Sequence, residues 1–315
     1  MGPYILKRLL YLIPVLFIVS VIVFSLIHLI PGDPATILLG TEAADEELLE
    51  RVRESMGLNQ PIHVQYGIWI RHVLQGDLGE SISTGKPVSQ LILERLPFTV
   101  ELALYSLLLI LILAIPFGTM AAVSSRRGVE FAFQSFTLLG LSVPDFVSGI
   151  LFILVFSVSL GWFPIVNFPA LTAAPLLNLK AFFLPALTLA LPQAAAISRM
   201  VRSSVFDVSR QDYTRTARAK GLSERVVIYK HMLRNAMIPT LTLIGIVTGY
   251  LLGGVIVVEY VFAIPGLGRL GVNAIAQRDY PTLQAIVLFV VTAFVLVNLL
   301  VDILYAYINP RIRYE

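Results

Sequence analysis

Residues that could carry out chemistry are few and scattered in this chain. The four histidines, His28, His63, His72 and His231, show no spacing typical of metal ligands, and the chain has no cysteine. The segment Thr84-Gly85-Lys86-Pro87 lacks the upstream glycine spacing and the Ser or Thr of a phosphate-binding loop. No Ser-His-Asp arrangement is visible either. The sequence therefore predicts no catalytic site, no metal site and no ATP site within the chain.

The composition explains why such residues are rare. Of the 315 residues, 57% are hydrophobic and 14% are charged, and the mean hydropathy is +0.83. An ordinary soluble domain carries about 25% charged residues. So much apolar surface requires lipid as its solvent, which predicts an all-α polytopic membrane protein. The net charge of +3 fits membrane topology better than nucleic-acid binding, so we expect no nucleic acid among the partners.

Six runs of the sequence are apolar enough and long enough to cross about 30 Å of hydrocarbon. They are Leu9 to Pro31, Leu102 to Ser125, Phe131 to Leu160, Ala181 to Ser198, Ala236 to Val258 and Tyr280 to Val301. An even number of spans places both termini on one side. The termini and loops of that side hold 15 Lys and Arg residues, against 3 in the two short loops opposite, which predicts cytoplasmic termini.

Acidic residues inside spans are candidates for function, because a charge in lipid is costly. Asp145 follows Pro144 within the third run, and broken helices are tolerated where they line a cavity. Pro144 and Asp145 are thus candidates for lining a pathway through the membrane, unless the span begins later and Asp145 lies near an interface. Glu101 and Glu259 lie near span ends, where contact with water is the simpler interpretation.

The spans divide the chain into residues 1–30, an outer loop 31–98, a five-span core 99–310 and a tail 311–315. The outer loop is too long to be a mere connection, so we expect a small subdomain there. One helix is predicted over Glu46 to Met56, and a second between Pro61 and Gly76. This subdomain could be a cap packed on the spans or a docking surface for an external partner.

The loop 199–235 is unusual because it holds 9 basic and 3 acidic residues. A short helix is predicted over Asp212 to Lys220, with Gly221 as its left-handed break and Ser223 as the cap of a returning helix. The apolar residues of the returning helix recur at helical spacing, namely Leu222, Val226, Tyr229, Leu233 and Met237. This helix could insert into a groove on a cytoplasmic protein or lie on the membrane surface.

The fifth run holds Gly245, Gly249 and Gly253 at four-residue intervals. Small residues on one face let helices approach closely in lipid. These glycines could serve packing within the chain or form a seam with a second subunit.

Longer motifs resemble one known family. Tyr213-Thr-Arg-Thr-Ala-Arg-Ala-Lys-Gly221-Leu, followed by His231-Met-Leu-Arg-Asn-Ala-Met-Ile-Pro239, is similar to the EAA loop of ABC-importer permeases in its peptide, glutathione and nickel version. The general pattern has Glu-Ala-Ala where this chain has Arg215-Thr216-Ala217. Further segments resemble the B-type subunit of these permease pairs, among them Pro31-Gly-Asp-Pro34, Gly76-Asp-Leu-Gly79, Glu259-Tyr-Val-Phe262 and Pro265-Gly-Leu-Gly-Arg269.

The resemblance implies the type I ABC importer transmembrane fold and a place in the bacterial inner membrane. It implies a second, homologous permease chain, two cytoplasmic ATPase subunits that bind ATP and Mg, and an extracytoplasmic substrate-binding protein. The cargo it implies is a short peptide, with glutathione as a special case and nickel or another small solute as the alternative. Coupling to the ATPase is carried over to the motif positions Thr216, Ala217, Arg218, Lys220, Gly221 and Leu222.

Two rival functions stay open at this stage. An ion-coupled secondary transporter predicts an inverted repeat and several acids at the membrane midplane, and neither is visible in the sequence. A membrane scaffold that recruits a cytoplasmic partner predicts a sealed core.

Overall fold

The apolar runs form long helices in the computed structural model, which describes residues 2–29, 50, 53, 59–164 and 167–308. Apart from Glu50 and Arg53, the predicted helix over Glu46 to Met56 lies outside the described residues. The regular elements, in chain order, are α1 (Gly2–Leu29), α4 (Ile62–Leu74), α5 (Val88–Val123), α6 (Arg127–Ser142), α7 (Asp145–Phe152), η1 (Ile153–Ser159), α8 (Pro175–Ser209), α9 (Asp212–Ala219), α10 (Glu224–Val226), η2 (Val227–Leu233), α11 (Arg234–Val261), α12 (Leu267–Ala276) and α13 (Tyr280–Ile308). Within the described ranges, β pairing is limited to one isolated bridge between Glu80 and Pro87.

In the described part of the chain, five helices are long and apolar enough to cross a membrane, namely α1, α5, α8, the continuous helix from α10 into α11, and α13. A sixth span exists if α6 and the α7–η1 helix count as one broken span. The spans match the six predicted runs, but α8 is much longer than Ala181 to Ser198. Pro185 and Pro192 lie inside α8 without ending it, because neighbouring helices can satisfy the backbone groups that a proline frees.

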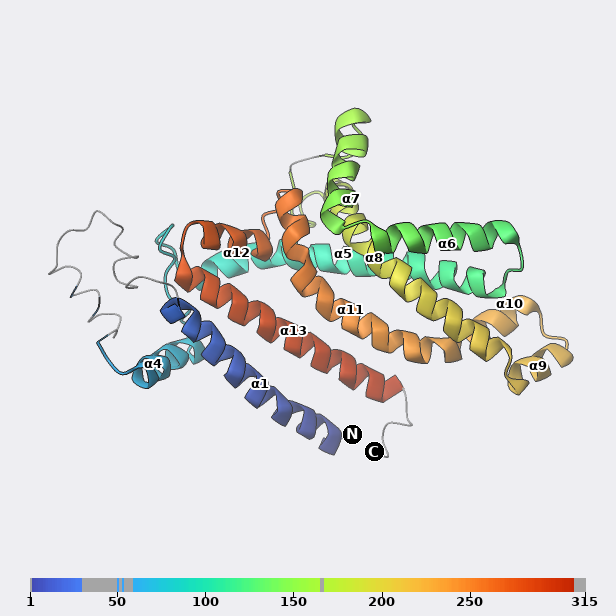
Figure 1. The fold of residues 1–315 in the computed structure, drawn as a ribbon, viewed down its shortest axis with the longest axis horizontal. Coiled ribbons are helices and arrows are strands. Elements are labelled where there is room, and N and C mark those ends of the chain that lie inside the picture. The colour runs from blue at the N-terminus through green and yellow to red at the C-terminus, as the bar shows by residue number, and fades with distance from the viewer. Residues whose placement is uncertain (1, 30–49, 51–52, 54–58, 165–166, 309–315) are drawn as a thin grey trace. The chain divides into compact units, whose positions relative to one another are not determined.

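The third predicted span differs from the expectation of one helix over Phe131 to Leu160. The helix stops at Ser142, and α7 starts at Asp145 after a bend of 105° (Figure 1). Pro144 accounts for the break, because proline disfavours helical geometry in the residue before it and cannot donate a backbone hydrogen bond. Val143 accordingly adopts an extended backbone. Asp145 therefore lies at the start of a new helix rather than in the middle of a straight span.

The chain forms two compact units, one made of Phe98–Ile264 together with 296–308, the other of Gly2–Pro97 together with Pro265–Val295. In the first unit, α8 packs on α6, α7 and α11. Of the 35 residues of α8, 16 are buried, including Ala186, Ala190 and Ala194 on one face. A Cβ added to Gly140 of α6 would lie 2.9 Å from the Ala195 Cβ atom. Small residues thus permit the close packing of α6 on α8.

The second unit joins N-terminal and C-terminal parts of the sequence. A small apolar core collects residues of α5, α12 and α13, namely Val88, Ile92, Leu267, Ala285 and Ile286. Helix α4 packs on α1, where the Tyr66 hydroxyl lies 2.7 Å from the Ser20 hydroxyl. The division predicted from the sequence assigned residues 265–295 to the core 99–310, whereas their contacts group them with 2–97.

Candidate functional site

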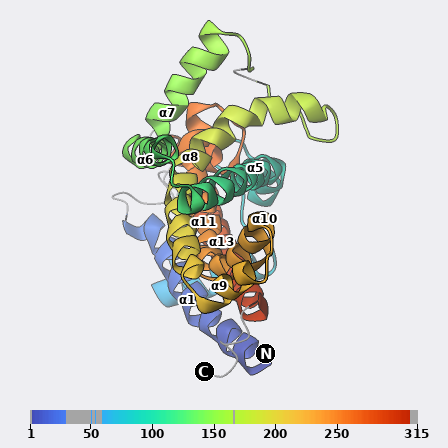
Figure 2. The ribbon, with the colours of Figure 1, turned by 90° about the vertical axis from the view of Figure 1, so that its right-hand side faces the viewer.

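The candidate site is the connection between α8 and α11, here called the α9 loop (residues 210–226). The sequence placed the start of this loop at Arg199, but α8 continues as a helix to Ser209. Helix α9 then runs over Asp212–Ala219, as predicted, and α10 begins directly after Ser223. Figures 1 and 2 both show α9 and α10 together at the same end of α8 and α11.

Two buried residues anchor α9 on its neighbours. The Thr214 side chain is fully buried, and its hydroxyl donates a hydrogen bond of 2.9 Å to the Val208 carbonyl of α8. Ala217, one turn later, is also buried. On the outer side, the Asn235 amide donates to the Tyr213 hydroxyl at 2.9 Å, which ties α9 to the start of α11. The first turn of α9 is therefore tied both to the end of α8 and to the start of α11.

Gly221 ends α9 in a Schellman arrangement. The Gly221 N–H bonds the Arg218 carbonyl at 2.9 Å, and the Leu222 N–H bonds the Ala217 carbonyl at 3.4 Å. The φ angle of Gly221 is +75°, in the left-handed region that glycine adopts most easily. Nothing lies within 4 Å of a Cβ added there. The backbone angle, rather than crowding within this chain, is the reason for a glycine at this position.

An ion pair closes the turn after α9. Arg218 Nε donates to Glu224 Oε1 at 2.8 Å, and Arg218 Nη2 approaches Glu224 Oε2 at 3.4 Å. The family motif predicts Arg218 to be a coupling residue that faces a partner. In the structure, its guanidinium pairs within the chain, because the turn at Gly221 brings Glu224 back beside it.

The other predicted coupling residues divide between surface and interior. Thr216, Lys220, Gly221 and Leu222 are exposed, whereas the burial of Ala217 removes its side chain from contact with any partner. Among the described residues, Lys220 makes no ion pair. Four of these predicted coupling residues are thus on the surface, while the coupling role itself stays a prediction.

The returning helix has a feature that its sequence pattern did not reveal. Residues Val227–Leu233 form a π-helical turn, which brings residues five apart close together. Val227 and Met232 are consequently buried, while Val226 and Tyr229 of the predicted apolar stripe are exposed. A search for apolar residues at α-helical spacing cannot detect this turn, because it assumes 3.6 residues per turn throughout. The exposed apolar residues next to Leu222 enlarge the free surface of the loop.

Of the three glycines at four-residue intervals in α11, Gly245 packs against another helix of the same chain. Gly245 is buried, and a Cβ added to it would overlap Val301 of α13. Gly249 is buried as well. The surroundings of Gly253 lie outside the described residues. The structure thus favours internal packing over a seam with a second subunit for Gly245, because its face is already covered.

Two acids near span ends lie in polar clusters. Glu259 is completely buried and accepts a hydrogen bond of 2.6 Å from Thr99, so the interpretation that water reaches it is wrong. The carboxylate of Glu101 accepts a hydrogen bond of 2.8 Å from the Asn178 amide. Asp145 is half-buried and lies at the start of α7, where a negative charge is favourable.

Within the described ranges, no cluster of His, Asp or Glu could hold a metal ion.

The second unit contains a buried carboxylate, Asp279, that was not among the residues singled out from the sequence. Asp279 accepts hydrogen bonds from the Ser81, Ser83 and Thr282 hydroxyls at 2.6, 3.1 and 2.8 Å, and from the Ile82 N–H at 3.2 Å. Burial raises the pKa of Asp279, but these hydrogen bonds outweigh it and hold the pKa below its usual value. The sequence does contain a signal for this role, because an Asp directly before a span is a typical N-cap residue. In the structure, Asp279 caps α13.

Comparison with known proteins decides the family. The model described as "Binding-protein-dependent transport system inner membrane component" matches residues 114–314, and the corresponding N-terminal model matches residues 1–103. The chain belongs to this family. It is therefore a permease subunit of an ABC importer in the inner membrane, and such permeases act with an ATPase and a binding protein.

The relatives of this permease support the same conclusion along its full length. It is 47% identical over 312 residues to the glutathione transport system permease protein GsiC of Salmonella choleraesuis (strain SC-B67), with 99% of each chain covered. The protein of the same name from Escherichia coli (strain K12) is 46% identical with the same coverage. A crystal structure of an amino acid ABC transporter matches with a TM-score of 0.50 at 16% identity, covering 71% of this permease and 94% of that chain. The permease thus has the all-helical type I ABC importer fold.

Proposed function

We propose that this permease moves short peptides, with glutathione as the first candidate, through the cytoplasmic membrane in an ATP-driven importer. The observation that carries the proposal is the 47% identity to GsiC across 99% of both chains. Identity of that extent includes the loops as well as the spans, which favours a related cargo. Nickel or another small solute is the alternative cargo, and the uptake assay described below distinguishes it from short peptides.

The assembly we propose contains a second, homologous permease chain and two cytoplasmic ATPase subunits. The ATPases bind ATP and Mg, and an extracytoplasmic protein delivers the cargo. Both termini and the α9 loop lie in the cytoplasm in this scheme, because the loop and its side of the membrane carry the excess of Lys and Arg. Residues 31–98 then face outward as a subdomain, while the core 99–310 carries the pathway.

The α9 loop transmits the movement of the ATPase in this proposal. Its exposed surface combines the cation of Lys220 with the apolar side chain of Leu222, and Tyr229 of the following π-helical turn is exposed as well. The anchors at Thr214 and Asn235 let a displacement of α9 move α8 and α11 together. ATP binding draws the two coupling loops of the assembly toward each other and opens the spans outward. Asp145 and Pro144, at the broken span, are the candidates for lining the pathway.

Uptake in cells that lack this chain tests the proposal. The wild-type chain should restore accumulation of labelled glutathione or of a labelled dipeptide. Nickel and single amino acids, added as unlabelled competitors, should not reduce this accumulation. Gly221→Glu should insert normally but abolish uptake, because Glu resists the left-handed backbone and adds a charge to the coupling surface. Gly221→Asn should retain much of the uptake, since Asn tolerates this backbone.

The matched control is Gly128→Glu, which places the same residue at another exposed glycine, in the first turn of α6. An acid is favourable there, so uptake should stay at the wild-type level. Full uptake by Gly221→Glu would overturn the coupling role. Restoration of nickel uptake alone would replace the peptide cargo by nickel. Uptake that follows an ion gradient and survives depletion of ATP would replace the importer by a secondary transporter.

A further inference from the structure

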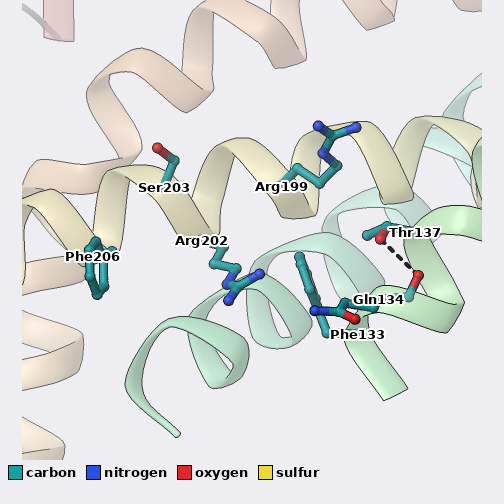
Figure 3. A pocket seen from close by; sticks show the side chains of 7 residues that line it. All are labelled: Phe133, Gln134, Thr137, Arg199, Arg202, Ser203 and Phe206. Carbon is teal, nitrogen blue, oxygen red and sulfur yellow. Dashed lines mark hydrogen bonds between the residues drawn. The ribbon is translucent and has the colours of Figure 1, made fainter. Parts of the chain in front are cut away.

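A groove between α6 and α8 lies outside the α9 loop and adjoins α6, the first helix of the broken span. It has a volume of about 440 Å³ and is lined by Phe133, Gln134, Thr137, Arg199, Arg202, Ser203 and Phe206 (Figure 3). A second hollow of about 360 Å³ continues it along α6 and shares Gln134, Thr137 and Arg199 with it. Both hollows belong to the first unit. Together they form one groove with a cationic part and an apolar part.

One of the two arginines in the groove is fully engaged. Arg202 Nη2 lies 2.9 and 2.7 Å from the two carboxylate oxygens of Glu130. The Arg202 guanidinium also lies over the Phe133 ring, 5.0 Å from its centroid. Figure 3 shows its side chain extending from α8 toward Phe133. The charge of Arg202 is therefore compensated within the chain, and its position is fixed.

Arg199 differs from Arg202 in having no such partner. Its side chain is exposed to the groove, and among the described residues it makes no ion pair and no hydrogen bond to another side chain. The groove consequently carries one uncompensated positive charge. Arg199 is also the first charged residue after the charge-free stretch of α8 from Ala181 to Ser198. A charge at the edge of the hydrocarbon is costly unless it meets an anion or polar headgroups.

The continuation of the groove is suited to a hydrocarbon chain. Leu138 and Leu141 of α6 line it and are 67% and 47% exposed. Both side chains are apolar and are left uncovered by this chain, as contact with an acyl chain requires. A hydroxyl, Ser203, and an amide, Gln134, lie at the cationic part and can donate hydrogen bonds to phosphate oxygens. The groove thus places phosphate-binding groups directly beside a surface for an acyl chain.

We propose that the α6–α8 groove binds the headgroup of an anionic phospholipid. Arg199 holds the phosphate, because a guanidinium matches phosphate oxygens with two parallel hydrogen bonds. The acyl chain lies along Leu138 and Leu141. Basic pockets between membrane helices are known to select anionic headgroups in this way. The bound lipid belongs to the leaflet adjoining the α9 loop, and the proposal is independent of cargo and of the direction of transport.

The test uses the complete transporter, purified with this chain and reconstituted in nanodiscs of phosphatidylcholine with a small share of phosphatidylglycerol of the same acyl chains. Lipid retention is measured by native mass spectrometry, and a photoreactive phosphatidylglycerol maps the contact site. The wild type should retain phosphatidylglycerol over phosphatidylcholine. Arg199→Gln should weaken this preference by about tenfold, the effect of losing one charge-assisted contact. Cross-links should fall on α6 and α8.

Two further variants separate the site from general charge effects. Arg199→Lys should keep part of the preference, because it keeps the charge but loses the paired geometry. Arg127→Gln removes an exposed cation at the start of α6 outside the groove and should leave the preference unchanged. Each variant is first checked for assembly and for its melting temperature. Both should equal those of the wild type, because the exchanged side chains are exposed.

Three results would overturn the proposal. An unchanged preference in Arg199→Gln would show that lipid selection occurs elsewhere. Inorganic phosphate that displaces phosphatidylglycerol at equal concentration would make the site one for soluble phosphate. Cross-links from a photoreactive residue at position 199 that fall on an acidic segment of the second permease, in place of lipid, would assign the groove to a subunit contact.

Discussion

Arg218 and Glu224 lie on the two sides of the turn at Gly221 and join them through a hydrogen bond of 2.8 Å. Both side chains are partly exposed, at 42% and 61%. An exposed pair of this kind contributes only about 0.2–1 kcal/mol to folding. Its consequence is therefore geometric: it restrains the direction in which the turn presents Lys220 and Leu222.

Breaking this pair should affect transport more than stability. Glu224→Ala should leave the melting temperature of the permease nearly unchanged. It should reduce uptake several-fold, because the turn at Gly221 is then no longer held in one orientation. The doubly exchanged variant Arg218→Glu with Glu224→Arg should recover part of the loss. The control is Asp212→Asn, since Asp212 pairs with Arg215 only within α9, at 3.8 Å. Equal uptake by Glu224→Ala and the wild type would contradict a positioning role.

Asp279 should make the second unit sensitive to acid. Its pKa in the folded chain is lowered from the ordinary value of 3.8, as burial is outweighed by the hydrogen bonds from Ser81, Thr282, Ile82 and Ser83. A lowered pKa contributes stability that is fully present above the unfolded pKa. This contribution is lost as the pH falls from about 4 through the folded pKa. Thermal unfolding in detergent between neutral and acid pH measures it.

Asp279→Asn should flatten this acid dependence and destabilise the permease by about 2 kcal/mol near neutral pH, because several hydrogen bonds to a charge are weakened. Asp207→Asn is the matched control, since Asp207 is exposed on α8. An acid dependence that persists unchanged in Asp279→Asn would assign it to other carboxylates.

Gly245 should tolerate no larger residue while Val301 is present. Gly245→Val would force its side chain into Val301, and overpacking of this kind costs about 1–3 kcal/mol. Shortening the neighbour in Gly245→Val with Val301→Ala should restore most of the stability. Gly128→Val, where nothing lies within 4 Å of the added Cβ, controls for the exchange itself. If the glycine instead served a subunit seam, the double variant would fold well but fail to assemble.

Local patterns of the sequence were sufficient for most of the long helices and for α9 with the turn that ends it. The apolar runs predicted the spans, since each run is long enough to satisfy its own backbone in lipid. Asp212 to Lys220 predicted α9, and Gly221 predicted the left-handed turn, because both depend on residues within one or two turns of each other. The family likewise followed from motifs read along the chain.

Features that depend on contacts between distant residues were decided only by the tertiary structure. The sequence could not pair Ser81 with Asp279, or Gly245 with Val301, because those residues meet only when separate segments pack. It underestimated the break at Pro144, since a proline alone does not set an angle of 105°. It also treated Arg218 as free, whereas the fold supplies Glu224. Local propensity thus determined which segments are helical, and packing decided which of their charged residues are left for a partner or a lipid.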